Sequence, residues 1–238
     1  RVVISGLGFI SSIGNDTASV TRSLRELRHG IATYEFFPGR DLEVKVAGTI
    51  KDFDTRSTHF SEWRWPECYA FERDVLRSLP PHGLHALCAV EQLIADAKLT
   101  PELLANGDTG LFTASAGSPF LQRHYLNQFY DSGCTRVHPM GIVSTIPGTL
   151  NFNLAPHYHI KGAVCGFVSA CASTAHAIGY ASDEIQLGRQ QRILIVGAED
   201  LTMESTYSFQ GMRALSRNTD PDTASRPFDQ ARDGFVGT

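Results

Sequence analysis

The chain has 238 residues, 42% of them hydrophobic, and a formal net charge of −4, which suits one or two domains with a buried core. A slightly acidic chain gives no electrostatic reason to expect nucleic acid or an anionic membrane as a partner. The cysteines form no C-x-x-C pair, and no apolar run approaches the ~20 residues that span a bilayer. We therefore expect a cytoplasmic protein in a reducing compartment.

The first part of the chain predicts strands alternating with helices. Residues 1–10 predict a strand with glycine breaks, and a helix is predicted between Asp16, which can cap its start, and Gly30. The segment GLGFIS does not predict a dinucleotide loop, because Ser11 replaces the third glycine and the expected downstream acid is absent. Residues 42–50 alternate in hydropathy and predict a half-exposed strand or hairpin.

The middle of the chain continues the same alternation. Residues 84–95 predict a helix with one buried stripe that includes Cys88, residues 110–115 a buried strand, and residues 120–130 an aromatic helix. Residues 192–196 predict a further short strand. Together these elements predict a largely parallel α/β sheet covered on both sides.

The segment around Cys171 changes period at that residue. Residues 164–169 predict a buried strand, and the helix that follows has Ala175, Ile178, Gly179 and Ser182 on one face and ends near Gly188. Cys171 would lie on an exposed turn, where the helix N–H groups and dipole stabilise a thiolate. From spacing alone a buried structural cysteine stays possible. Cys165, inside the strand, is expected to be desolvated and inert.

The histidines give no catalytic or metal-binding pattern. His176 follows Cys171 on the same helix but out of register with it, so it is expected to pack within the helix. His157 and His159 are expected in a loop or edge strand. Two histidines without a third ligand do not make a zinc site, so no metal is expected.

Several segments carry a family resemblance, and they occur in a fixed order: RVVISGLGFISSIG, VEQLIADAKLT, VSACASTAHAIG, RILIVGAEDL, FQGMRALS and RPFDQARDGFV. They resemble the β-ketoacyl-acyl carrier protein synthases of the elongating, thiolase-fold type. The resemblance implies a thiolase-like layered α-β-α-β-α fold, of which residues 1–238 form the N-terminal half as a single domain. It also implies that Cys171 is the acyl-accepting nucleophile, with its own N–H in the oxyanion hole.

The implied activity is an acyltransferase reaction, the decarboxylative Claisen condensation of a Cys171-bound acyl chain with malonyl-acyl carrier protein. Fatty acid, polyketide and polyene biosynthesis all use this chemistry, and none of it needs a metal or organic cofactor. The family's two catalytic histidines, lysine and glycine-rich loop belong to its second half, and those blocks do not occur in these 238 residues.

The resemblance extends to a pocket, a docking surface and partners. It places Met140 and Gly141 beside the acyl channel or the partner subunit, and Arg73, Arg77 and Arg136 at the carrier-protein docking surface. The expected partners are acyl carrier protein, acyl and malonyl thioesters, and a second subunit. That subunit would complete either a homodimer or a heterodimer of ketosynthase and chain-length factor.

Three other interpretations stay open. A biosynthetic thiolase forms the same bond without decarboxylation, although the SACAST and RPFDQARDGFV blocks argue against it. A non-condensing chain-length partner would lack the cysteine, whereas Cys171 is present. A papain-like hydrolase would need a different cysteine context and a downstream histidine block, and neither occurs.

Overall fold

The computed structural model describes residues 1–36 and 39–238, which divide into two compact units. The first unit combines Arg1–Gly8 with Asp54–Glu199, and the second combines Phe9–Phe53 with Asp200–Thr238. Elements of the first unit are η1 (Phe60–Glu62), α2 (Arg73–Leu76), α3 (Pro81–Asp96), α4 (Pro101–Leu104), β3 (Thr109–Ala114), α5 (Pro119–Asp131), α6 (Leu150–His157), β4 (Val164–Phe167), α7 (Ser173–Gln186) and β5 (Arg192–Gly197). Elements of the second unit are α1 (Thr17–Arg25), β1 (Ile31–Thr33), β2 (Val46–Gly48), α8 (Met203–Gly211) and α9 (Pro221–Ala224). That residues 1–238 act as a single domain stays a prediction.

The first unit is built on a three-stranded parallel sheet in the order β4-β3-β5. The register places Ala114 of β3 opposite Phe167 of β4 and Gly197 of β5. The three strands therefore end level with one another, and the turns that follow them meet at one edge of the sheet. The predicted strands at residues 110–115 and 192–196 and the parallel α/β class are confirmed.

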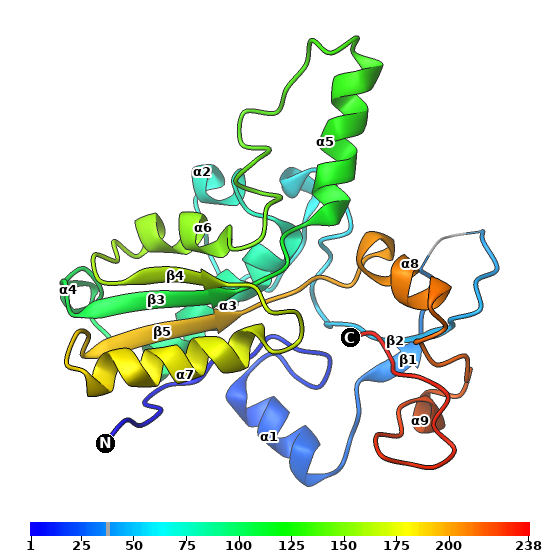
Figure 1. Cartoon of the computed structure of the whole chain (residues 1–238), viewed down its shortest axis with the longest axis horizontal. Coiled ribbons are helices and arrows are strands. Elements are labelled where there is room, and N and C mark those ends of the chain that lie inside the picture. Colours follow the sequence, from blue (N-terminus) through cyan, green and yellow to red (C-terminus); the bar gives the residue numbers. More distant parts are fainter. Residues whose placement is uncertain (37–38) are drawn as a thin grey trace. The chain divides into compact units, whose positions relative to one another are not determined.

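Helices cover both faces of this sheet, with α7 on one face and α6 and α3 on the other (Figure 1). Side chains alternate between the faces because successive residues of a strand point in opposite directions. Phe112 of β3 packs with the buried residues Ala177 and Ala181 of α7. The next residue, Thr113, faces α6 and donates a hydrogen bond to Asn151 Oδ1 at 2.9 Å. The two helix layers thus fix β3, and with it the edge where the site lies.

Helix boundaries follow local capping chemistry. Ser118 caps α5 by accepting the Leu121 N–H, and Asp16 caps α1 by accepting the Ser19 N–H at 2.7 Å, as predicted. The predicted end of α1 at Gly30 is wrong, because Leu27 takes a left-handed φ of 54° and breaks the helix just after Arg25. Within the described residues, no helix combines the length and apolar character that crossing a bilayer requires.

Three strand expectations need correction. Residues 1–10 form no regular strand, and Val3 and Ile4 are exposed, since a strand needs a hydrogen-bonded neighbour and the described residues supply none. The strand β4, expected to be buried, is mostly exposed because it lies at the sheet edge. The strand β2, expected to be half-exposed, is buried and pairs with β1.

In the second unit, the segment RPFDQARDGFV is held by hydrogen bonds to the chain around Ser216. Asp233 accepts the Ser216 hydroxyl at 2.7 Å and the Arg217 N–H at 2.9 Å. The Ser216 hydroxyl, followed by the Arg217 N–H, lowers the pKa of the Asp233 carboxyl. Phe235 adds backbone pairing with Ala214 at 3.0 Å. The carboxylate form of Asp233 is therefore the one that holds this segment in place.

Candidate active site

Cys171 lies on the turn between β4 and α7, with its side chain exposed. The turn reverses sharply at Ala170, which adopts a left-handed φ of 48° at a cost of about 1–2 kcal/mol for a residue with a Cβ. Ser173 Oγ closes the turn by accepting the Ser169 N–H and donating to the Ala170 carbonyl, both at 2.7 Å. The prediction of an exposed cysteine at a strand-to-helix junction is confirmed.

The N-terminus of α7 is open to a negative charge at Cys171. Its N-cap, Ala172, has no side chain that could accept a helix N–H, and the first turn contains no acidic residue. The backbone bonds that close the turn come from the Ala172 and Ser173 N–H groups, each 3.1 Å from its acceptor. The Cys171 N–H takes no part in those bonds. Uncapped N–H groups and the helix dipole both stabilise a thiolate or an oxyanion here.

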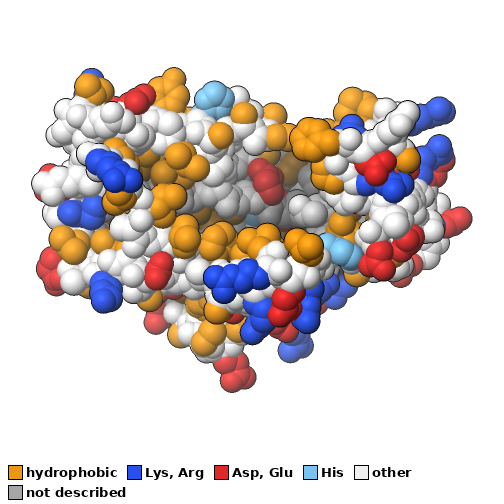
Figure 2. Space-filling model, turned by 90° about the horizontal axis from the view of Figure 1, so that it is seen from below, with side chains coloured by type: hydrophobic (Ala, Val, Ile, Leu, Met, Phe, Trp, Pro, Cys, Tyr) orange, Lys and Arg blue, Asp and Glu red, His pale blue; other side chains and the backbone are white. Residues whose placement is uncertain are grey.

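The outer face of α7 exposes large apolar side chains among polar ones. Gly188 ends the helix with a left-handed φ of 72°, as predicted. The sheet-facing residues are Ala177 and Ala181, whereas Ile178 is 53% exposed and Tyr180 58% exposed. Hydrophobic side chains are spread over the face of the molecule drawn in Figure 2. The predicted face with Ile178 therefore points away from the sheet.

Two polar contacts at the carboxyl edge of the sheet were not predicted from the sequence. Ser115, directly after β3, lies 2.8 Å from His82 Nε2, and both side chains are buried. Glu199, shortly after β5, accepts the Ala116 N–H at 2.6 Å through Oε1. The sequence could have pointed to Ser115 and Glu199, because each lies at or just beyond the end of a predicted strand, and polar residues there in parallel sheets commonly face a ligand site.

Met140 and Gly141 lie in the turns after α5 and are partly buried. A Cβ added at Gly141 would lie 3.1 Å from the His138 carbonyl oxygen and 3.5 Å from the Tyr125 ring. The His138 and Tyr125 rings stack at 4.4 Å with an interplanar angle of 7°. Gly141 therefore borders an aromatic pair, and its role beside an acyl channel stays a prediction.

The three arginines predicted to dock a carrier protein are all exposed. Arg73 begins α2 and lies 5.8 Å above the Phe60 ring, and Arg77 caps the end of that helix. Burial lowers the pKa of His138, and the nearby charge of Arg77 lowers it further. Arg77 therefore lies close enough to the segment around Gly141 for its charge to act on His138. Arg136 lies in the loop after α5, where its N–H donates to Ser132 Oγ at 2.9 Å.

The remaining cysteines differ in exposure. Cys88 is buried in α3 as predicted, and burial raises the pKa of its thiol to about 12. Cys165 is exposed, so the prediction that it is desolvated is wrong, because β4 lies at the sheet edge. Cys68 and Cys134 are also exposed. Exposure alone therefore does not single out Cys171, whereas its place before an uncapped helix does.

The histidine expectations were less accurate. His176 is exposed rather than packed, because the sheet contacts the α7 face of Ala177. His157 is the last residue of α6, so its expected place in a loop or edge strand is wrong, whereas His159 lies in the turn that follows, with a left-handed φ of 53°. Across residues 1–36 and 39–238, no three histidine, cysteine or acidic side chains are grouped to hold a metal ion.

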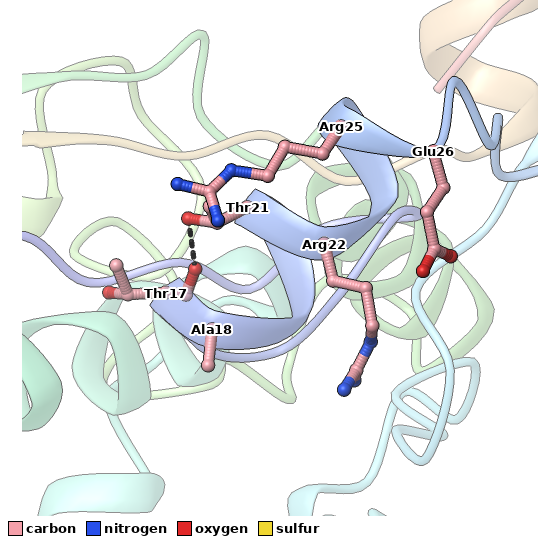
Figure 3. A pocket seen from close by; sticks show the side chains of 6 residues that line it. All are labelled: Thr17, Ala18, Thr21, Arg22, Arg25 and Glu26. Carbon is pink, nitrogen blue, oxygen red and sulfur yellow. Dashed lines mark hydrogen bonds between the residues drawn. The ribbon is translucent and has the colours of Figure 1, made fainter.

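A depression in the second unit is formed by α1 alone (Figure 3). The residues that line it are Thr17, Ala18, Thr21, Arg22, Arg25 and Glu26. Its side chains come from one helix and its end, and Thr21 Oγ1 already donates to the Thr17 carbonyl at 2.7 Å. With no second element to close it, this depression is a weaker candidate than the Cys171 edge.

Fold and site together define an α/β protein with a parallel sheet and an exposed cysteine at a strand-to-helix turn. Residues 1–238 match the family described as "Beta-ketoacyl synthase, N-terminal domain", and the chain belongs to that family. The 3-oxoacyl-[acyl-carrier-protein] synthase 1 of Escherichia coli K12 is 36% identical over 99% of this chain and 56% of its own length. The protein of the same name from Haemophilus influenzae is 35% identical over the same shares.

A solved structure supports the same family. The crystal structure of a β-ketoacyl synthase from Burkholderia phymatum matches with a TM-score of 0.85 and 28% identity, over 100% of this chain and 56% of its own. The predicted thiolase-like class, with this chain as the N-terminal half, is confirmed. The chain spans about half the length of the relatives it matches.

Proposed function

We propose that this chain is the nucleophile-bearing half of a β-ketoacyl-[acyl-carrier-protein] synthase. The observation that carries the proposal is Cys171, exposed on a strained turn before the uncapped N-terminus of α7. Relatives named 3-oxoacyl-[acyl-carrier-protein] synthase support the substrate class, because they match 99% of the chain. Acyl carrier protein and acyl and malonyl thioesters are accordingly the proposed partners and substrates.

In the first half-reaction, the Cys171 thiolate attacks the carbonyl carbon of the carrier-bound acyl thioester. The tetrahedral intermediate carries an oxyanion, and the Cys171 N–H before α7 is the donor that the proposal assigns to it. Collapse of the intermediate expels the carrier thiolate, which takes up a proton, and leaves the acyl chain as a thioester on Cys171. This is nucleophilic catalysis of the ping-pong type.

In the second half-reaction, malonyl-acyl carrier protein loses CO2 and leaves an enolate. The enolate carbon attacks the acyl carbonyl on Cys171, a carbon–carbon bond forms, and the Cys171 thiolate is released. The route is complete without a metal ion or organic cofactor. The family resemblance assigns the stabilisation of the enolate to the two histidines of its second half, and those blocks do not occur in these 238 residues.

The same proposal covers docking, the pocket and assembly. Arg73, Arg77 and Arg136 are exposed cations suited to an acidic carrier protein, and Met140 and Gly141 would border the acyl chain. The exposed apolar residues of β4 and α7 support a second subunit, whether identical or a chain-length factor. A cytoplasmic location fits these substrates.

The test is the intact mass of the full-length protein, and of its Cys171→Ala variant, after incubation with acyl and then malonyl carrier protein. We expect an acyl adduct on the wild type, product with CO2 release, and neither with Cys171→Ala. Condensation of acyl and acetyl thioesters in the absence of a malonyl group would indicate a thiolase instead. Cys171→Gln should condense nothing while retaining malonyl decarboxylation, because its amide can occupy the oxyanion site.

A further inference from the structure

The turn after β3 is held by a carboxylate from the neighbouring strand. At the end of the sheet, the Ala198 N–H still pairs with the Ala114 carbonyl at 3.1 Å. One step further, the Glu199 side chain takes over this role, since its Oε1 accepts the Ala116 N–H at 2.6 Å. Glu199 therefore fixes the turn where regular strand pairing has ended.

The opposite side of this turn is fixed by a buried hydroxyl. Ser115 Oγ lies 2.8 Å from His82 Nε2 and accepts the Gly117 N–H at 3.1 Å. His82 is 0% exposed and Ser115 3% exposed. Gly117 has a left-handed φ of 84°, and a Cβ there would lie 2.3 Å from the Thr145 carbonyl oxygen. The turn is thus hydrogen-bonded on one side by Glu199 and on the other by Ser115, and its Gly117 packs closely against the Thr145 carbonyl.

Backbone contacts connect this turn to the segment that precedes Cys171. The Ser118 N–H donates to the Thr145 carbonyl at 2.9 Å, and the Gly148 N–H donates to the Ser115 carbonyl at 3.4 Å. Gly148 in turn lies against β4, because a Cβ added at Gly166 would be 3.1 Å from its Cα. The strand β4 leads directly into the Cys171 turn.

The segment that follows Cys171, the first turn of α7, is contacted by β5. A Cβ at Gly197 would lie 2.4 Å from Thr174 Oγ1, in the first turn of α7. Glu199 follows Gly197 closely in the chain, so its hydrogen bond to Ala116 links the strand that supports α7 to the turn that supports residues 145–148.

We propose that Glu199 is a positioning residue of the acyl-accepting site, which holds the 115–118 turn and, through it, residues 145–148 against the strand that leads to Cys171. The inference rests on the proposed function of Cys171. What the site needs from Glu199 is an acceptor oxygen at the reach of a glutamate side chain, and not its negative charge. A glutamine can supply that oxygen, whereas an aspartate is too short.

The test compares three variants of the full-length protein: Glu199→Gln, Glu199→Asp and Glu199→Ala. Glu184→Ala is the matched control, because it removes a carboxylate that pairs with Arg189 at the far end of α7. Acyl transfer to Cys171 from acyl carrier protein is timed by intact mass over a range of carrier concentrations. Amide hydrogen exchange of residues 115–118 and 145–148 reports how readily these two segments open.

Losing the hydrogen bond to the Ala116 N–H should slow acyl transfer about tenfold in Glu199→Asp and Glu199→Ala. The loss should fall on the maximal rate and not on the KM for carrier. Both turns should exchange faster, and Glu199→Gln and Glu184→Ala should stay within about twofold of wild type. Wild-type rates in Glu199→Asp, or a glutamine variant as slow as the alanine one, would overturn the inference. If the wild type forms no acyl adduct while residues 115–118 and 145–148 still exchange faster in Glu199→Asp and Glu199→Ala, the proposed function alone would be refuted.

Discussion

Replacing Gly197 with alanine should disturb the Cys171 turn from a distance, through a single contact. Gly197 ends β5, and its backbone does not adopt a left-handed φ, so alanine is compatible with its conformation. The obstacle is Thr174 in the first turn of α7. A Cβ at position 197 would lie 2.4 Å from Thr174 Oγ1 and 3.3 Å from its Cγ2.

The size of the effect follows from these distances. Carbon–carbon contacts are optimal at about 3.5–4.0 Å, so Thr174 must shift by about 1 Å, and its branched side chain has few rotamers in a helix. Overpacking of this kind costs about 1–3 kcal/mol. Thr174→Ala removes both crowding atoms and leaves its own Cβ at 3.4 Å, an ordinary contact. The double variant should therefore regain about 1–2 kcal/mol.

The assay is native-state hydrogen exchange of the α7 amides, which gives the local free energy of opening for the wild type, both single variants and the double variant. Gly197→Ala should lower that free energy, and Thr174→Ala alone should change it by no more than about 0.5 kcal/mol. Rescue in the double variant would confirm the contact. Strictly additive effects would refute the packing of β5 against the start of α7.

Three further predictions concern other parts of the chain. Gly141→Phe should shorten the longest acyl chain accepted, with Gly141→Ala as the milder control, and an unchanged product distribution would place position 141 outside the channel. Charge reversal at Arg73, Arg77 or Arg136 should raise the KM for carrier-bound substrates at low salt and lose its effect at high salt, while no change at low salt would exclude that residue from docking. Because the folded state lowers the pKa of Asp233, its contribution to stability is present above the unfolded pKa and lost as pH falls through the folded one. Asp233→Asn should remove that acid-sensitive part from a series of melting temperatures, and an unaltered acid profile would contradict the hydrogen-bonding argument.

Local patterns were sufficient to predict the elements whose neighbours lie within the chain. The buried strand at residues 110–115 and the helix at residues 84–95 were predicted because their apolar residues face partners close by. The exposure of Cys165 was missed because apolar β-branched residues look alike on central and edge strands. The strand predicted at residues 1–10 was wrong for a related reason, since an alternating pattern does not show whether a neighbouring strand is present to pair with it.

The site was predictable in part. The change of period at Cys171 located the strand-to-helix turn on which that residue lies, because this signal is local to the chain. The His82–Ser115 pair and the Glu199–Ala116 bond join residues that are 33 and 83 positions apart. No periodicity within one element reports such contacts, and only the register of three parallel strands brings them to a common edge.

The most direct test of the account is to map the acyl adduct by peptide mass spectrometry on the full-length protein, loaded with acyl carrier protein in the absence of a malonyl substrate. The account predicts that the adduct lies on Cys171 alone and disappears in Cys171→Ala. Cys165 is the sharpest internal control, because it is also exposed but lies in β4 and not before an open helix N-terminus. An adduct on Cys165, or on any residue other than Cys171, would contradict the central claim.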